Sequence, residues 1–171
     1  INSVIKAKDG VKLWTGIAKD PFYGNSPGLR QWRADLAKGI YDKDNWAKNG
    51  KNSIFQGRQV GAIVLEVPNS MLGSDIKLFA TTAVQRSPGK WEQVQYSANP
   101  LFSHAMLLDS EALKESHDRS RPTMQTEEVN AVAARALRCT AITKSQKDPV
   151  AYSNEVVAKL VPCGSAYRVD D

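Results

Sequence analysis

The longest apolar run of the chain lies near its middle, within Arg58–Thr82. Residues Gly61–Val67 are nearly all apolar and rich in β-branched side chains, which predicts a strand buried on both faces. Pro68 interrupts the run because proline has no N–H for a sheet ladder, and the asparagine and serine after it favour a turn. The pattern resumes over Ile76–Thr82. We therefore expect two strands of one sheet, joined by a tight connection.

The first 40 residues combine a strand pattern with a helix pattern. Val4–Ala7 and Val11–Trp14 flank a Lys-Asp-Gly sequence, which predicts a hairpin. Apolar residues at helical spacing predict a helix over Leu29–Lys38, and Gly39 suits the position just after its end. The polar segment Tyr41–Asn52 is predicted to be a surface loop, which we expect its one tryptophan to anchor.

The pattern becomes helical towards the C-terminus. Trp91–Tyr96 alternates and predicts one more half-buried strand, whereas Asp109–Ser116, Thr126–Arg138 and Pro149–Leu160 have the caps and spacing of helices. The chain thus predicts an α+β fold with an antiparallel β-sheet or barrel-like core and C-terminal helices. We expect a single domain or part of one, with a β-rich core over residues 1–122 and a helical segment over 123–171.

Charge and hydropathy narrow the possible partners. The formal net charge of +5 mildly favours anionic partners, but the lysines and arginines are scattered and no nucleic-acid motif occurs. We therefore expect solvated surface charge and no nucleic-acid partner. No run of about 20 apolar residues occurs, so no membrane span is predicted.

The two cysteines and the first residue bear on the compartment. The chain begins with Ile1 and has no signal peptide, so we expect that a leader was removed or that the chain was cut from a longer one. Cys139 falls at the end of one predicted helix and Cys163 just beyond the next. A disulfide between them would tie the two helix ends together and would suit an oxidising compartment. The alternative is two reduced, buried thiols.

Five short motifs follow one another along the chain. They are Asp20–Tyr23 (Asp-Pro-Phe-Tyr), Val64–Pro68 (Val-Leu-Glu-Val-Pro), Phe79–Thr82 (Phe-Ala-Thr-Thr), Asn99–Leu101 (Asn-Pro-Leu) and Asp118–Pro122 (Asp-Arg-Ser-Arg-Pro). In this order they resemble the family called domain of unknown function 4331, whose members are mostly bacterial and often exported. One departure is Phe79, where the family has a tryptophan.

The resemblance implies a partner chain. It covers Val11–Pro122 and begins where the middle of the family begins, without the strands that usually precede it. The strands 61–67 and 76–82 would then keep long apolar edges, which promote association. The resemblance therefore implies a second polypeptide chain that supplies the missing strands, either from the same precursor or as a separate subunit. It also implies a secreted or periplasmic location, and no established activity.

Three residues are candidate acid–base groups. His104 lies in an apolar stretch and is either a catalytic base or a satisfied core histidine, whereas we expect His117 on the surface. Glu66 interrupts the most apolar strand and is either a pocket acid with a perturbed pKa or a strand-end carboxylate in solvent or bound to an arginine. Asp20 suits an Asx turn, and any further role for it rests on the resemblance.

Candidate ligand-binding residues are aromatic or basic. The aromatic candidates for a small apolar ligand are Trp14, Phe22, Tyr23 and Trp91. Arg119 and Arg121 suit bidentate binding of a carboxylate or phosphate, with surface salt bridges as the alternative. The spacing of histidines and cysteines predicts no metal site, and no fingerprint for a nucleotide cofactor occurs.

These observations leave three functional hypotheses. The first is an exported, non-catalytic binding or structural module that completes a β-rich assembly with another chain. The second is an enzyme that acts on a small apolar or natural-product-like substrate in a β-barrel pocket. The third is a binder of anions or polysaccharide surfaces that uses the scattered basic residues. Fold analogy alone does not choose among them.

Overall fold

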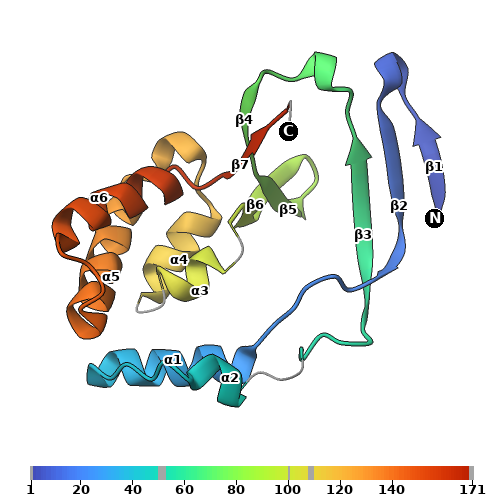
Figure 1. The fold of residues 1–171 in the computed structure, drawn as a ribbon. Helices are drawn as coiled ribbons and strands as arrows, with labels where there is room; N and C mark the ends of the chain where they lie inside the picture. The colour runs from blue at the N-terminus through green and yellow to red at the C-terminus, as the bar shows by residue number, and fades with distance from the viewer. Residues whose placement is uncertain (1, 50–52, 100, 108–109, 170–171) are drawn as a thin grey trace. The chain divides into compact units, whose positions relative to one another are not determined.

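Three antiparallel strands from the N-terminal part of the chain form the largest sheet in the computed structural model (Figure 1). They are β1 (Ser3–Lys6), β2 (Lys12–Lys19) and β3 (Gln59–Glu66), and β2 lies between the other two. Asp9 and Gly10 have positive φ values of 59° and 82° in the turn between β1 and β2, as a tight hairpin requires. The predicted N-terminal hairpin is confirmed.

The chain divides into two compact units. Unit 1 is Ile1–Gly73 and unit 2 is Ser74–Asp171. The structure describes residues 2–49, 53–99, 101–107 and 110–169, so Pro100 of a predicted motif and Asp109 of a predicted helix lie outside it. The segment predicted as the β-rich core, residues 1–122, also contains helices, and a strand follows the last helix.

The helices of unit 1 follow the first two strands. The helix α1 (Ser26–Lys38) begins where the Asn25 side chain accepts a hydrogen bond from the Gly28 N–H at 2.9 Å. It ends at Gly39, whose φ of 71° is left-handed, so the predicted helix and its C-terminal glycine are confirmed.

The segment predicted as a loop after α1 contains the short helix α2 (Asn45–Asn49). The buried Asn45 anchors it, because its Nδ2 donates to the Gly28 carbonyl at 2.8 Å. Trp46 is 47% exposed, and its ring lies over Gly28 of α1, where an added Cβ would come within 2.8 Å of it. The predicted tryptophan thus contacts α1, and beside it the buried Asn45 amide satisfies a backbone carbonyl.

Unit 2 contains two separate two-stranded sheets. The strand β4 (Asp75–Leu78) pairs with β7 (Ser165–Arg168), and β5 (Ala80–Ser87) pairs with β6 (Lys90–Ser97), both antiparallel. The prediction that 61–67 and 76–82 are neighbours in one sheet is therefore wrong. A 3-10 turn over Asn69–Met71 follows β3, and β4 pairs with a strand about 90 residues later rather than with its neighbour in sequence.

The helices of unit 2 carry the principal core. They are α3 (Phe102–Ala105), α4 (Glu111–Asp118), α5 (Glu127–Thr143) and α6 (Pro149–Leu160). Figure 1 shows α5 and α6 side by side, joined by a short connection. The predicted bounds of α6 are confirmed, and Ser110 caps α4 by accepting from the Leu113 N–H at 3.1 Å. The buried cluster comprises Tyr96, Phe102, Leu107, Val132 and Cys163.

The fold class is α+β, with antiparallel sheets and C-terminal helices, as predicted. Of the two predicted forms of the core, the barrel is wrong for the described residues. Their strands form one three-stranded and two two-stranded sheets, none of them closed. Closure needs a continuous ladder from the first strand to the last.

Candidate functional site

Unit 1 has very little hydrophobic core. Among the described residues, Leu36 of α1 is the only large apolar side chain of unit 1 that is buried, and the remaining buried apolar side chains belong to unit 2. The chain exposes 12109 Å² of surface, whereas two separate compact bodies of these lengths would expose about 10,000 Å² together. Unit 1 therefore presents apolar surface that a self-sufficient domain would bury.

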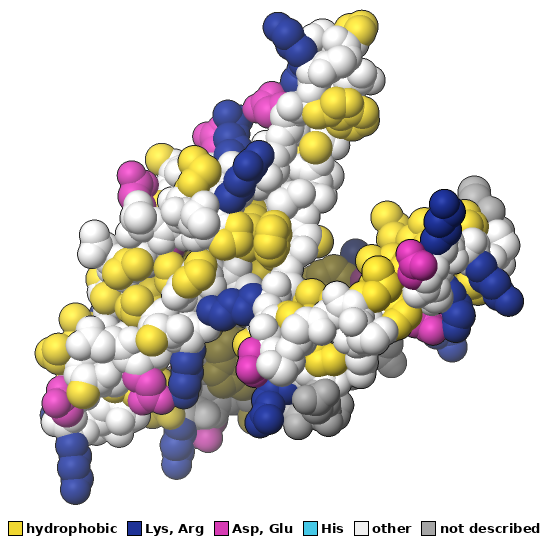
Figure 2. All heavy atoms as spheres, turned by 90° about the horizontal axis from the view of Figure 1, so that it is seen from above, with side chains coloured by type: hydrophobic (Ala, Val, Ile, Leu, Met, Phe, Trp, Pro, Cys, Tyr) yellow, Lys and Arg dark blue, Asp and Glu magenta, His cyan; other side chains and the backbone are white. Residues whose placement is uncertain are grey.

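That surface is concentrated on β3. Ile63, Val64 and Leu65 are exposed by 78%, 54% and 62%. Consecutive strand residues point to opposite faces, so both faces of this strand are apolar and open. The prediction that the strand is buried on both faces is wrong for the chain by itself. Figure 2 shows hydrophobic side chains at the surface on the face that it displays.

Both faces of the whole sheet are apolar, although Leu13 and Trp14 on its central strand are half-buried. In the strand register, Val4, Trp14 and Val64 lie opposite one another on one face, and Ile5, Leu13 and Leu65 do so on the other. Trp14 lies over Gly16, where an added Cβ would come within 2.5 Å of its ring. Sheets with two apolar faces are normally covered on both sides.

The two outer edges of this sheet differ. The β1 edge is four residues long and ends in a lysine, features that discourage further pairing. The β3 edge is eight residues long and contains neither proline nor lysine. A Cβ built on Gly61 has no neighbour within 4 Å. The β3 edge is therefore the open one.

The backbone bonding pattern shows which groups face that edge. The Asp20 N–H donates to the Arg58 carbonyl at 3.0 Å, which extends the ladder between β2 and β3. In an antiparallel sheet, successive residues of a strand bond alternately to the strand on one side and to the strand on the other. Because Arg58 bonds to β2, the even-numbered residues from Arg58 to Glu66 bond to β2. The N–H and C=O groups of the odd-numbered residues Gln59, Gly61, Ile63 and Leu65 therefore point to the free edge.

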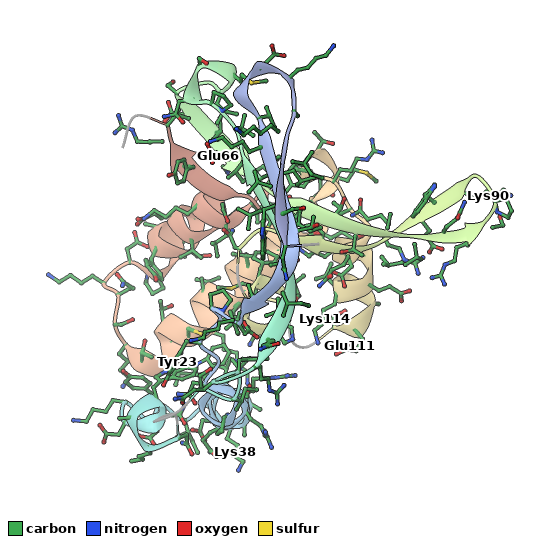
Figure 3. The ribbon with its side chains drawn as sticks, turned by 90° about the vertical axis from the view of Figure 1, so that its right-hand side faces the viewer. Tyr23, Lys38, Glu66, Lys90, Glu111 and Lys114 are labelled. Carbon is green, nitrogen blue, oxygen red and sulfur yellow. The ribbon has the colours of Figure 1, made fainter. Side chains whose placement is uncertain are left out.

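Two of the candidate acid–base residues lie in unit 1. Glu66 ends β3 (Figure 3) and binds Lys12 Nζ at 2.6 Å, with most of its side chain in solvent. It matches the strand-end alternative, with lysine in place of the expected arginine, and an exposed pair of this kind contributes about 0–1 kcal/mol. Asp20 Oδ1 accepts from the Phe22 N–H at 3.0 Å, which is the predicted Asx turn.

The two histidines lie in the opposite environments from those predicted. His104 is exposed on α3, where its Nδ1 lies 3.2 Å from Ser103 Oγ. His117 is only 2% exposed. The core alternative for His104 and the surface prediction for His117 are wrong for the same reason: the short α3 turns its histidine away from the apolar neighbours it has in sequence, whereas α4 turns His117 into the core. A catalytic role for His104 stays a prediction.

The aromatic candidates are divided between the two units. In unit 1, Phe22 packs edge-on against Phe55 with ring centroids 5.3 Å apart, and Tyr23 is exposed. Trp14 belongs to the sheet face described above. In unit 2, Trp91 is exposed on β6 next to Lys90, which Figure 3 shows at the tip of the β5–β6 hairpin.

The basic candidates lie at the surface of unit 2. Arg119 bonds Glu115 at 2.9 Å and lies 3.5 Å from Glu92, in agreement with the salt-bridge alternative. Arg86 also binds Glu92, and these two arginines lower the pKa of that carboxyl, Arg86 the more strongly. Arg121 is exposed.

A buried polar cluster in unit 2 was not predicted from the sequence. His117 Nδ1 lies 3.0 Å from Glu128 Oε1, and both side chains are almost fully buried. Tyr96 and Phe102 pack against the His117 ring at 5.2 and 4.9 Å. The acidic pair at the start of α5 indicates only a favourable interaction with the helix dipole, so local sequence does not show that one member turns inward.

Cys163 closes this cluster from the C-terminal side. Its N–H donates to Gln125 Oε1, its carbonyl accepts from the Tyr96 hydroxyl, and Gln125 Nε2 donates to Ser120 Oγ at 3.2 Å. Burial raises the pKa values of the Cys163 thiol and the Tyr96 hydroxyl. A thiol held neutral is a poor nucleophile, so these contacts support a structural role for the cluster.

Both cysteines carry free thiols in this structure. Cys139 lies one turn before the end of α5 and is partly buried, and burial raises its pKa as well. The disulfide between Cys139 and Cys163 stays a prediction.

Unit 2 also has an open pocket of about 230 Å³ beside α5. Its lining residues are Met106, Leu107, Ser110, Leu113, Ala131, Ala134, Arg135 and Arg138. The floor is apolar and α5 contributes two guanidinium groups. None of the predicted site residues lines it.

Membrane helices and metal clusters are both absent from the described residues. These residues include no helix with the length and apolar character to cross a membrane. They also include no group of three or more histidine, cysteine or acidic residues arranged to hold a metal ion. The open β3 edge and the apolar faces of its sheet form the candidate site.

Comparison with known proteins gave no family model, curated protein or solved structure that matches this chain. The resemblance to domain of unknown function 4331 stays a prediction.

Proposed function

We propose that this protein is a non-catalytic binding or structural module, and that another polypeptide chain completes the sheet of unit 1. The observation that carries the proposal is the exposure of Ile63, Val64 and Leu65 beside an unpaired strand edge. Burial of one such side chain contributes about 1.5–3 kcal/mol, and unpaired strand edges are templates for further strands.

The weakness of the core in unit 1 also supports this proposal. A sheet of three strands gains stability from a covered face, and unit 1 covers neither face well within the described residues. A partner that adds strands would bury the apolar side chains and satisfy the outward N–H and C=O groups of β3 in one step. The resemblance to exported proteins supports a secreted or periplasmic location for this assembly.

Native mass spectrometry of the protein isolated from its source tests the proposal. We expect a complex heavier than the 18.8 kDa chain, and a denaturing spectrum of the same sample identifies the chains in it. A chain that stays monomeric at micromolar concentration would contradict the proposal, because its exposed sheet would then need no partner.

A second candidate function is the binding of a small apolar anion in the pocket beside α5, as a carrier or an enzyme. The observation that favours it is the pairing of an apolar floor with Arg135 and Arg138, since guanidinium groups suit carboxylates. Native spectra would reveal a retained ligand as extra mass, lost in Arg138→Ala but kept in the exposed control Arg33→Ala. A spectrum that shows no extra mass would speak against this function.

A further inference from the structure

We propose that the strand added at the β3 edge is β3 of a second copy of this chain, paired antiparallel about a twofold axis at Ala62. The two sheets would then join into one six-stranded sheet with β3 and its copy at the centre. This inference rests on the proposed function and names the partner.

The alternation of hydrogen bonds along β3 restricts the registers in which two copies can pair. The outward N–H and C=O groups belong to odd-numbered residues of β3, as derived from the Asp20–Arg58 bond. Paired residues of an antiparallel ladder either both bond across the interface or both bond away from it. Odd-numbered residues of one copy must therefore lie opposite odd-numbered residues of the other, which excludes half of all registers.

Charge selects one register from those that remain. Arg58 precedes β3 and Glu66 ends it, so the two ends of the edge carry opposite charges. With Ala62 on the axis, Arg58 of each copy lies directly opposite Glu66 of the other. Opposite charges in directly opposed positions stabilise strand pairs, and like charges destabilise them. A shift of two residues would lose both charge pairs.

The same register completes the backbone bonding. Gln59 lies opposite Leu65 of the other copy and Gly61 lies opposite Ile63, so the outward N–H and C=O groups of all four residues are bonded. Val60 meets Val64 on the same face, and β-branched pairs of this kind suit cross-strand packing. Glu66 can accept the additional contact because Lys12 bonds to only one of its oxygens, Oε1.

Gly61→Pro tests pairing at this edge, with Gly61→Ala as the matched control. The Gly61 N–H faces outward, so proline removes an interface donor but no donor of the ladder between β2 and β3. We expect the dimer dissociation constant to rise about a hundredfold in Gly61→Pro and to stay within about threefold of the parent in Gly61→Ala. Circular dichroism of both variants checks that the fold is kept.

Ala62→Cys tests the register and does not depend on the proline variant. On the twofold axis the two Ala62 Cα atoms lie about 4.5 Å apart, within the range of a disulfide. The control Val64→Cys places its two thiols about 13 Å apart. We expect mild oxidation to cross-link Ala62→Cys alone, with peptide mapping to separate the new bond from Cys139 and Cys163.

The outcomes distinguish this inference from the proposed function. A monomer at all concentrations overturns both. A complex with a different chain overturns the inference that the partner is a second copy, and it leaves the proposed function in place. A homodimer that Gly61→Pro does not weaken overturns the pairing at the β3 edge. A homodimer that cross-links through Val64→Cys and not Ala62→Cys overturns the register.

Discussion

Burial separates the candidate site residues that contribute to stability from those that are available for recognition. Glu128 and His117 are buried together, whereas Glu66, Arg119 and His104 are at the surface. Residue types in the sequence did not separate these two groups, because burial depends on which face of its helix or strand each residue occupies.

Removal of Glu128 should strongly destabilise unit 2. Glu128→Ala leaves the buried His117 Nδ1 without its partner at 3.0 Å, and loss of one member of a buried pair costs about 3 kcal/mol. The exposed neighbour Glu127 is the matched control, and Glu127→Ala should change stability by less than about 0.5 kcal/mol. Urea unfolding followed by circular dichroism measures both, and equal effects would contradict the buried pair.

At the scale of elements, local signals predicted the N-terminal hairpin and the longer helices, but not the short helices α2 and α3. The N-terminal hairpin, α1 with its glycine end and α6 with its proline start depend on residues within one or two turns of each other. Strand partners were not predicted, because β3 pairs with β2 about 50 residues earlier and β4 pairs with β7. Those pairings depend on contacts that no local pattern records.

The candidate site could be predicted only in part. The apolar character of Gly61–Val67 was expected from the sequence, and a partner chain was implied only by the family resemblance. That β3 presents a free edge, and that its odd-numbered residues face outward, required the register and the Asp20–Arg58 bond. The aromatic candidates occur on different strands and loops of the two units, because residue type alone does not set where a side chain lies.

The end of α1 supplies a prediction at this scale. Gly39 has a φ of 71° and no atom within 4 Å of the place a Cβ would take, and Gly73 has equal space without a positive φ. Gly39→Ala should lower the free energy of unfolding by about 1 kcal/mol through backbone strain, and Gly73→Ala should cost less. Tryptophan fluorescence in urea reports on unit 1 through Trp14, Trp32 and Trp46. Equal urea midpoints for the Gly39→Ala and Gly73→Ala variants would contradict the claim that Gly39→Ala strains the backbone.

At the scale of the whole molecule, the two units differ in how complete they are. Unit 2 has the buried apolar cluster and a satisfied polar cluster, whereas unit 1 has a sheet with two apolar faces and one open edge. We propose on the basis of that contrast that unit 1 acquires its missing contacts by association. In the proposed dimer, a second copy of β3 would supply the matching bonds and charges in the register about Ala62.

Residue-resolved amide hydrogen exchange along β3 tests this claim most directly. In the assembled protein, the outward amides of Gly61, Ile63 and Leu65 should exchange as slowly as those of Ala62 and Val64, which bond to β2. After dilution to the monomer, only the outward amides of these three residues should exchange fast. Fast exchange of the outward set at every concentration would contradict the account, and so would protection that survives dilution.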